Sequence, residues 1–306
     1  MRVAVTGASG RLGGALVRAL GDAAFVGPAG PIAWTRADLD LDDAARTSAV
    51  MLDRDRPEVV VHTAAWTDVD ACARQPELAM RRNGEATGAL AVLCAQREID
   101  LVAISTNEVF DGLRDHERGY RPGDAPAPGN AYGRSKLAGE RAAIDAFERG
   151  AGRGSLGVVR TAWLYGPPGD DFPRKIVAAA DRAVASGSAL RLVEDEWGSP
   201  TLAADLADAI VELLAENALA GSHHLVNGGI ASRAGWAEDV LTRVGVDVPI
   251  EHVGADTWER VSRPPRWGVL ETTALPSGEP MRAWPAAMAD YAPLLLRDRA
   301  RATTAR

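Results

Sequence analysis

The chain has 306 residues, of which 46% are hydrophobic and 25% are charged, and its formal net charge is -8. This length allows one large domain or two closely packed ones, and the negative charge argues against generic binding to nucleic acid or anionic membranes. No stretch approaches the roughly 20 apolar residues of a membrane span, so we expect a cytoplasmic protein.

Short apolar runs alternate with segments of helix length along the first third of the chain. They follow one another as VAVTG and RLGGALVRAL, PIAWT and LDDAARTSAVMLDRD, EVVVHTAA and PELAMRRNGEATGALAVLCAQRE, and then DLVAIST. Continuous apolar strands separated by helices are typical of parallel sheets covered on both faces. The sequence therefore predicts a doubly wound α/β fold, followed by a long loop over residues 111–130 and a helix from Ala131.

The second half of the chain predicts a smaller α/β lobe. SLGVVRTAWLYG, residues 155–166, predicts one more strand, and from about residue 171 the pattern loosens before ADLADAIVELLAE and SHHLVN return to the sheet. We expect residues 1–165 and about 200–230 to form the larger domain. Residues from about 166 to 199 and 231 to 306 should form the smaller, substrate-binding lobe, with RDRARATTAR as a solvated tail.

A glycine array lies between the first strand and the first helix. TGASGRLGGAL places Gly7, Gly10 and Gly13 there, with Arg11 and Leu12 inside the turn. Glycine permits a tight turn and the close approach of a pyrophosphate, while the helix N-terminus supplies N–H donors. In a βαβ unit this array predicts an NAD(P)-binding Rossmann domain. The alternative is a tight strand-to-helix turn without a ligand.

The end of the second strand bears on the choice of cofactor. An acidic residue there usually binds the ribose 2'-hydroxyl of NAD, whereas an arginine suits the 2'-phosphate of NADP. The strand ends WTRADLD, so Arg36 favours NADP(H). A solvated arginine is the alternative, which keeps NAD(H) possible. Asp38 and Leu39 are expected to border the adenine.

Lys136 is one of only two lysines in the chain, and it follows Tyr132 by four residues in YGRSKLAGE. On a helix this spacing puts both side chains on one face. A nearby ammonium favours tyrosinate and should lower the pKa of Tyr132, making it a usable proton donor and acceptor. A compact ammonium also suits the hydroxyls of the nicotinamide ribose, which an arginine would match less well.

These motifs, in this order, resemble those of the extended short-chain dehydrogenase/reductases, and most closely the dTDP-4-dehydrorhamnose reductase family. The similar segments are GASGRLGGAL, VVVHTAAWTDVDACA, RRNGEATGAL with Asn83, ISTNEVFDG, YGRSKLAGE, RTAWLYG, EWGSPT and RPPRWGVLETT. The resemblance spans nearly the whole chain. It implies an NAD(P)H-dependent oxidoreductase, a monomer or homodimer, that reduces the 4-keto group of a nucleotide-linked 4-keto-6-deoxy sugar such as dTDP-4-dehydrorhamnose.

The resemblance also implies roles for individual residues. Thr106 would hydrogen-bond the substrate carbonyl oxygen, Tyr132 would protonate that oxygen, and Lys136 would orient the cofactor ribose. Ala64 and Ala65 would lie beside the nicotinamide. The cofactor would supply the hydride, and the protein would supply placement and electrostatics.

Three further residues resemble substrate contacts of the family. Trp163 resembles an aromatic wall for the sugar ring, although a lone tryptophan is as often a core residue. Arg263 and Arg266 resemble residues near the nucleotide diphosphate, where bidentate contacts favour arginine. A surface role is the alternative for both arginines.

The chain departs from the family after the catalytic threonine, where STDYVFDG is replaced by STNEVFDG. In related sugar-nucleotide 4,6-dehydratases the triplet is Thr-Asp-Glu, with Asp as acid and Glu as base. Asn107 has no titrating proton, so a complete elimination site is not supported. Glu108 is expected to bind a sugar hydroxyl, to assist an epimerisation, or to be a polar pocket residue. His62 replaces the asparagine of the family's NAAA stretch, and we expect packing or a cofactor contact for it.

Other candidate sites are weaker. His223 and His224 are adjacent on a strand and point to opposite faces, so the sequence predicts no metal site. Cys72 and Cys94 form no CxxC motif and are expected to be buried thiols.

Two alternatives to a reductase stay open. One is a nucleotide-sugar epimerase or dehydratase that uses Glu108. The other is a non-catalytic NADP-binding regulatory subunit, because the β-subunit of methionine adenosyltransferase also resembles this family. The intact set of Thr106, Tyr132 and Lys136 favours an enzyme.

Overall fold

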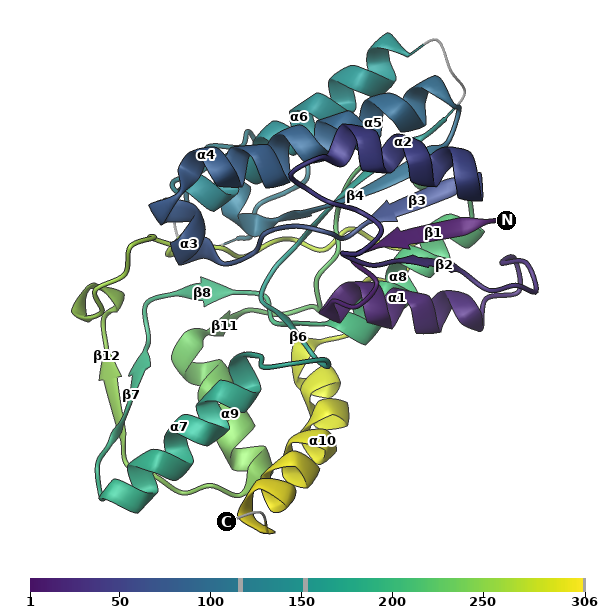
Figure 1. Ribbon diagram of the computed structural model, residues 1–306. Coiled ribbons are helices and arrows are strands. Elements are labelled where there is room, and N and C mark those ends of the chain that lie inside the picture. Colours follow the sequence, from purple (N-terminus) through teal and green to yellow (C-terminus); the bar gives the residue numbers. More distant parts are fainter. Residues whose placement is uncertain (115–117, 151–153, 305–306) are drawn as a thin grey trace.

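The computed structural model describes residues 1–114, 118–150 and 154–304. Its largest sheet has six parallel strands in the order β10-β5-β4-β3-β1-β2. The strands are β1 (Val3–Thr6), β2 (Ile32–Trp34), β3 (Val59–His62), β4 (Asp100–Thr106), β5 (Leu156–Thr161) and β10 (Gly221–His224). Helices cover both faces of this sheet (Figure 1). The predicted doubly wound α/β fold is therefore confirmed.

The sheet separates two apolar layers, which explains its uniformly apolar strands. Helices α1 (Arg11–Gly21) and α8 (Ala203–Ala215) cover one face. Helices α2 (Ala44–Asp55), α5 (Ala86–Gln96) and α6 (Ala131–Arg149) cover the other (Figure 1). Leu16 and Ile210 are fully buried in the first layer, and Leu90 and Ala143 are buried in the second. Every residue of β1 and β3 is buried between them.

Two segments differ from their predicted elements. The single helix predicted from residue 76 is divided into α4 (Pro76–Ala79), the π-helical turn η1 (Met80–Glu85) and α5, and the short helix α3 (Val69–Arg74) precedes them. The strand predicted over residues 155–166 ends with β5, and β6 (Leu164–Tyr165) follows separately. The break falls at Trp163, whose φ of 44 is left-handed and incompatible with a continuous strand.

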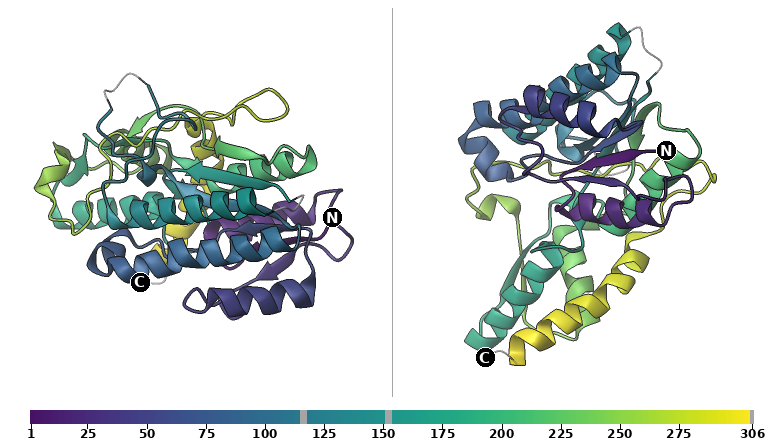
Figure 2. Two further views of the ribbon diagram at one scale, coloured as in Figure 1. Left: turned by 90° about the horizontal axis from the view of Figure 1, so that it is seen from above. Right: turned by 45° about the vertical axis from the view of Figure 1, so that its right-hand side comes forward.

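Most of the remaining elements form the smaller lobe (Figures 1 and 2), whereas Trp267, Leu270 and Met281 pack against the sheet domain. Its helices are α7 (Phe172–Ser186), α9 (Arg233–Val244) and α10 (Trp284–Thr304). Paired short strands are β7 (Leu190–Val193) with β12 (Ile250–Val253), β8 (Trp197–Gly198) with β11 (Ala231–Ser232), and β6 with β9 (Thr201–Leu202). Two 3-10 turns, η2 (Asn107–Val109) and η3 (Ala255–Thr257), complete the elements. Trp236, Met288 and Tyr291 are buried in the core of this lobe.

The segment from residue 297, predicted as a solvated tail, is helical as far as residue 304, although Arg297 and Arg301 are exposed as expected. Asp298 forms an ion pair with Arg174, and Arg299 forms one with Asp181, both across to α7. These ion pairs therefore connect α10 to α7. Both helices project from the sheet domain (Figure 2). Residues 305–306 of the tail and 115–117 of the predicted loop lie outside the described residues.

Two further sequence expectations can be compared with the fold. Cys72 and Cys94 are buried and unbonded to each other, as predicted, and burial raises the pKa of Cys72 to about 11. Among the helices that the structure describes, none combines the length and apolar character needed to cross a bilayer.

A buried ion pair fixes α6 against the sheet. Arg160 of β5 and Glu140 of α6 are 6% and 3% exposed, and Arg160 Nη2 donates to Glu140 Oε2 at 2.7 Å. Arg160 Nε donates to the same carboxylate, and Arg160 Nη1 donates to the Pro122 carbonyl. Each charge is satisfied only while the helix keeps this position, because either charge alone would be buried without compensation.

We predict that Glu140→Gln lowers the free energy of unfolding by about 3–5 kcal/mol, since Arg160 would keep its buried charge without a counter-ion. Asp145→Asn is the matched control, because Asp145 forms an exposed pair with Arg149 on the same helix. The control should lose no more than about 0.5 kcal/mol. Chemical denaturation followed by circular dichroism measures both, and equal losses would contradict the importance of the buried pair.

Candidate active site

A cavity of about 850 Å³ lies at the carboxyl ends of β1 to β5. This is the edge at which open α/β sheets bind their ligands. Its wall includes most of the predicted site residues, namely Gly7, Gly10, Arg11, Leu12, Gly13, Arg36, Leu39, Ala64, Ala65, Thr106, Asn107, Glu108, Tyr132, Lys136 and Trp163. The wall does not include Asp38, Arg263 or Arg266.

The turn after β1 requires glycine at two positions. Gly7 has a φ of +64, and a Cβ at Gly13 would lie 2.2 Å from the Gly7 carbonyl oxygen. The amide of Gly10 donates to that same oxygen at 2.8 Å, which closes the turn. The helix can therefore begin directly against the strand, leaving its N-terminus at the cavity. This close approach of backbone to the cavity fits a dinucleotide pyrophosphate.

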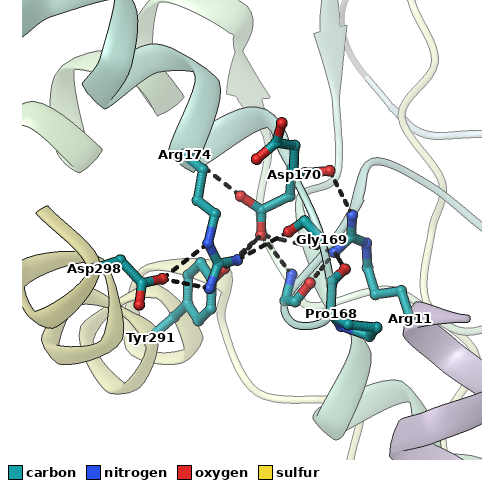
Figure 3. A network of polar contacts seen from close by, with 9 residues as sticks. Arg11, Pro168, Gly169, Asp170, Arg174, Tyr291 and Asp298 are labelled. Carbon is teal, nitrogen blue, oxygen red and sulfur yellow. Dashed lines mark hydrogen bonds and ion pairs between the residues drawn. The ribbon is translucent and has the colours of Figure 1, made fainter. Parts of the chain in front are cut away.

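Arg11 connects this turn to the smaller lobe (Figure 3). Its guanidinium donates to the carbonyl oxygens of Gly166, Pro168 and Asp170. The loop that it holds connects β6 to α7 and forms part of the cavity wall through Pro168 and Gly169. The side chain of Arg11 is thus occupied by the protein, and its predicted contact with a cofactor stays a prediction.

The same loop is anchored from its other side by Asp171, whose side chain is completely buried. The carboxylate accepts hydrogen bonds from the Gly166 amide at 2.9 Å and the Tyr291 hydroxyl at 2.5 Å. It also caps α7 by accepting from the Arg174 amide. Figure 3 shows how Arg11, the loop and α10 form one polar network. The cavity wall is therefore fixed to both lobes.

The segment after β2 lines the opposite end of the cavity. Arg36 is exposed there, and Leu39 is buried, with Asp40 and Leu41 beside it in the wall. Asp38, expected to border the adenine, instead accepts hydrogen bonds from the amide and hydroxyl of Thr35. The turn uses this carboxylate internally, which removes it from the wall.

Arg82 and Asp42, which the sequence analysis missed, also line this end of the cavity. Arg82 of η1 donates to Asp42 at 2.5 Å, and its guanidinium lies 5.4 Å from the centre of the Trp66 ring. The hydrogen bond from Arg82 holds the pKa of Asp42 down at about 2. These contacts link segments far apart in the sequence, so no local motif could have indicated them.

His62 belongs to a buried hydrogen-bond chain rather than to the cavity wall. Thr6 Oγ1 accepts from the amides of Thr63 and Ala64, so its own proton points to His62 Nδ1 at 2.9 Å. The His62 Nε2 proton then points to Thr87 Oγ1 at 3.3 Å. Burial lowers the pKa of His62 to about 3, so it is neutral. The packing role expected for His62 agrees with these contacts.

Asn83 ties the loop after β3 to the helix that carries Tyr132. Its side chain accepts from the Trp66 amide at 2.7 Å and donates to the Trp66 carbonyl at 3.0 Å. It also donates to Ser135 Oγ, which in turn donates to the Tyr132 carbonyl. The π-helical turn η1 places Asn83 where it can reach both, as such turns often do near functional sites.

Thr106, Tyr132 and Lys136 meet in the wall of the cavity. Thr106 ends β4, and the other two lie on successive turns of α6. Burial, followed by the charge of Glu108, raises the pKa of Tyr132, while a hydrogen bond with Thr106 lowers it to a lesser extent. The expected lowering by Lys136 is therefore wrong for this cavity, because desolvation of the phenolate dominates.

Lys136 itself is 5% exposed. Burial lowers its pKa to about 8, and the Glu140 carboxylate raises it to a lesser extent. Among the described residues its ammonium makes no hydrogen bond, so its donors are available to a ligand in the cavity.

The two departures after Thr106 have different surroundings. Asn107 is buried; its amide donates to the Gly268 carbonyl at 3.0 Å, and its side-chain oxygen accepts from Thr106 Oγ1. Glu108 is partly buried and accepts a 2.6 Å hydrogen bond from Asn130, the N-cap of α6. Burial raises the pKa of Glu108. Asn107 is thus structural, whereas Glu108 presents a carboxyl group to the cavity.

Comparison with known proteins identifies the family. The family described as "RmlD substrate binding domain" matches residues 1–295. The chain belongs to this RmlD family. The resemblance inferred from the ordered motifs is therefore confirmed.

Individual relatives of this RmlD-family chain match over most of its length. A dTDP-4-keto-6-deoxy-D-glucose reductase from Streptomyces niveus is 36% identical over 96% of this chain and 97% of its own. A dTDP-4-dehydrorhamnose reductase from Mycolicibacterium smegmatis is 34% identical over 94% and 84%.

Solved structures agree with this assignment. A dTDP-4-dehydrorhamnose reductase from Clostridium acetobutylicum has a TM-score of 0.86 at 29% identity, covering 96% of this chain and 99% of its own. That from Bacillus anthracis, solved in complex with NADP, has a TM-score of 0.82 at 27% identity, covering 95% and 98%.

Two of the predicted substrate residues of this RmlD-family chain lie away from the cavity wall. Arg266 forms ion pairs with Asp195 and Asp256, and Arg263 is exposed. The wall instead contains Arg233, the first residue of α9, which the sequence analysis missed. No local motif marks Arg233, because its position in the wall depends on how α9 packs.

Among the described residues there is also no cluster of three or more His, Cys, Asp or Glu side chains that could hold a metal ion.

We predict that Arg11→Ala lowers the free energy of unfolding by roughly 1.5–3 kcal/mol, because three backbone carbonyls lose a charged donor. Arg18→Ala is the matched control, since Arg18 is exposed on the same helix, and it should change stability by no more than about 0.5 kcal/mol. Denaturation and NADPH titration of both variants test this. If Arg11→Ala kept its stability but lost NADPH affinity, Arg11 would serve the cofactor rather than the loop.

Proposed function

We propose that this protein reduces the 4-keto group of a nucleotide-linked 4-keto-6-deoxy sugar, such as dTDP-4-dehydrorhamnose, with NADP(H) favoured over NAD(H). The observation that carries the proposal is the convergence of Thr106, Tyr132 and Lys136 in one cavity with the glycine turn. The names of full-length relatives as reductases of dTDP-linked keto sugars support the reaction class. The NADP complex of a structural relative supports the cofactor.

The residues present fit a dinucleotide cofactor. The turn of Gly7, Gly10 and Gly13 would hold its pyrophosphate, and Arg36 would face a 2'-phosphate at the exposed end of the cavity. Ala64 and Ala65 would border the nicotinamide end. When bound, the reduced cofactor supplies a hydride.

The remaining chemistry belongs to the protein. Since burial raises the pKa of Tyr132, this side chain stays protonated at neutral pH and can donate its proton to the oxygen of the reduced carbonyl. Thr106 would hydrogen-bond the same oxygen. Lys136, with unsatisfied donors close by, would bind ribose hydroxyls and orient the reacting groups.

The alternatives are less well supported. A dehydratase needs an acid beside Thr106, and Asn107 has its amide bonded to the Gly268 carbonyl instead. An epimerase is the second candidate, because the raised pKa of Glu108 and its place in the wall suit a general base. A purely regulatory subunit gives no reason for the intact set of catalytic side chains.

We predict that Tyr132→Phe lowers turnover by at least about 100-fold, because the phenolic proton is lost while the ring still packs. NADPH affinity should stay nearly unchanged. Oxidation of NADPH, followed by absorbance with a dTDP-linked 4-keto-6-deoxy sugar, measures turnover, and NADPH fluorescence measures binding.

Tyr120→Phe serves as the control for that variant. The Tyr120 hydroxyl bonds Asp111 and lies outside the cavity wall, so its removal should leave turnover near the wild-type value. Unchanged turnover in Tyr132→Phe would disprove the proton-donor role. Sugar conversion by the wild type without NADPH consumption would favour the epimerase.

A further inference from the structure

One guanidinium in the cavity wall has more N–H donors than its ion-pair partner can occupy. Arg233 lines the cavity, and 24% of its side chain is exposed. Among the described residues its guanidinium forms an ion pair with Glu196, a long 3.6 Å contact between Nε and Oε2. An arginine carries five N–H donors in a planar fork. A partly buried fork whose ion pair within the protein is this long predicts a ligand that supplies further acceptors.

Glu196 does not need Arg233 as its main partner. This carboxylate is 3% exposed and accepts a 2.9 Å hydrogen bond from Arg260 Nη1. Two arginines therefore share one carboxylate, so Glu196 offsets only part of their combined charge. Glu108 also acts on Arg233, although less strongly than Glu196. The charge of Arg233 remains available to an anion.

Two aromatic rings lie beside this guanidinium. It lies 3.7 Å from the centre of the Trp163 ring and 5.2 Å from the centre of the Phe172 ring. Stacking on aromatic rings is favourable for arginine and leaves the edge of the fork free to donate. The face of Trp163, predicted to contact the sugar ring, is thus covered by the guanidinium of Arg233. This group recognises anionic oxygens.

The other cations of the described wall are placed for different tasks. Arg11 and Arg82 are bonded within the protein, Arg36 lies beyond β2, and Lys136 lies beside Tyr132 on α6. Arg266 is outside the wall and paired with carboxylates. Arg233 is therefore the guanidinium that the smaller lobe offers to the cavity.

We propose that Arg233 binds the diphosphate of the nucleotide-sugar substrate, in the role that the sequence assigned to Arg263 and Arg266. The inference rests on the proposed function, because a nucleotide-linked substrate is what brings a diphosphate to this part of the cavity. Guanidinium groups bind phosphate oxygens bidentately, which suits a fork that lies over the Trp163 ring.

The test measures binding without turnover. Thymidine diphosphate, uridine diphosphate and thymidine are titrated into the NADPH-bound protein by calorimetry. Arg233→Gln should weaken binding of the preferred diphosphate roughly 10–100-fold, while thymidine and NADPH affinities stay unchanged. Arg233→Lys, which keeps the charge but loses the fork, should fall between wild type and Arg233→Gln.

Arg260→Gln is the matched control, because Arg260 shares Glu196 but lies outside the wall. If its diphosphate affinity falls as far as that of Arg233→Gln, the effect acts through Glu196 and the inference is overturned. Normal diphosphate affinity in Arg233→Gln, or a loss confined to Arg263→Gln and Arg266→Gln, also overturns it.

The outcome separates this inference from the proposed reaction. Diphosphate binding that depends on Arg233, in a protein that oxidises no NADPH with keto sugars, supports the binding role and contradicts the reductase. Absence of diphosphate binding in the wild type contradicts the binding role.

Discussion

The buried ion pair between Glu140 and Arg160 determines where the reactive side chains lie. Glu140 is one turn beyond Lys136 on α6, and Arg160 is on β5, so the pair sets the helix that carries Tyr132 against the sheet. Arg160 also holds the Pro122 carbonyl, which ties down the loop preceding the helix. Because neither charge can be buried alone at low cost, α6 has one favoured position.

The parallel sheet supplies the second constraint. Carboxyl ends of parallel strands meet at one edge, and the register pairs Thr106 of β4 with Thr161 of β5 at that edge. The glycine turn and the loop after β3 lie beside them. Side chains from distant segments therefore reach one cavity. The smaller lobe closes the remaining side. It does so through the loop held by Arg11 (Figure 3) and through Arg233 on α9.

The sequence predicts those features that depend on local pattern. Apolar runs indicate the strands, and the four-residue spacing of Tyr132 and Lys136 places them together because a helix has a fixed geometry. Prediction from the sequence fails for residues whose position depends on a contact with a segment far along the chain. Asp38 is used by its own turn, and Asp298 pairs with Arg174 of α7 from a helix where a tail was predicted. Arg233 reaches the cavity only through the packing of α9. The raised pKa of Tyr132 was also missed, because burial is a property of the fold.

The most direct test of the account is to follow the hydride itself. The protein would be given NADPH deuterated at both positions of nicotinamide C4, together with a dTDP-linked 4-keto-6-deoxy sugar, and the product would be examined by NMR. The account predicts one deuterium at C4 of the sugar for each NADPH oxidised. A changed sugar that carries no deuterium, with NADPH left intact, would contradict the reductase and point to the carboxyl group of Glu108.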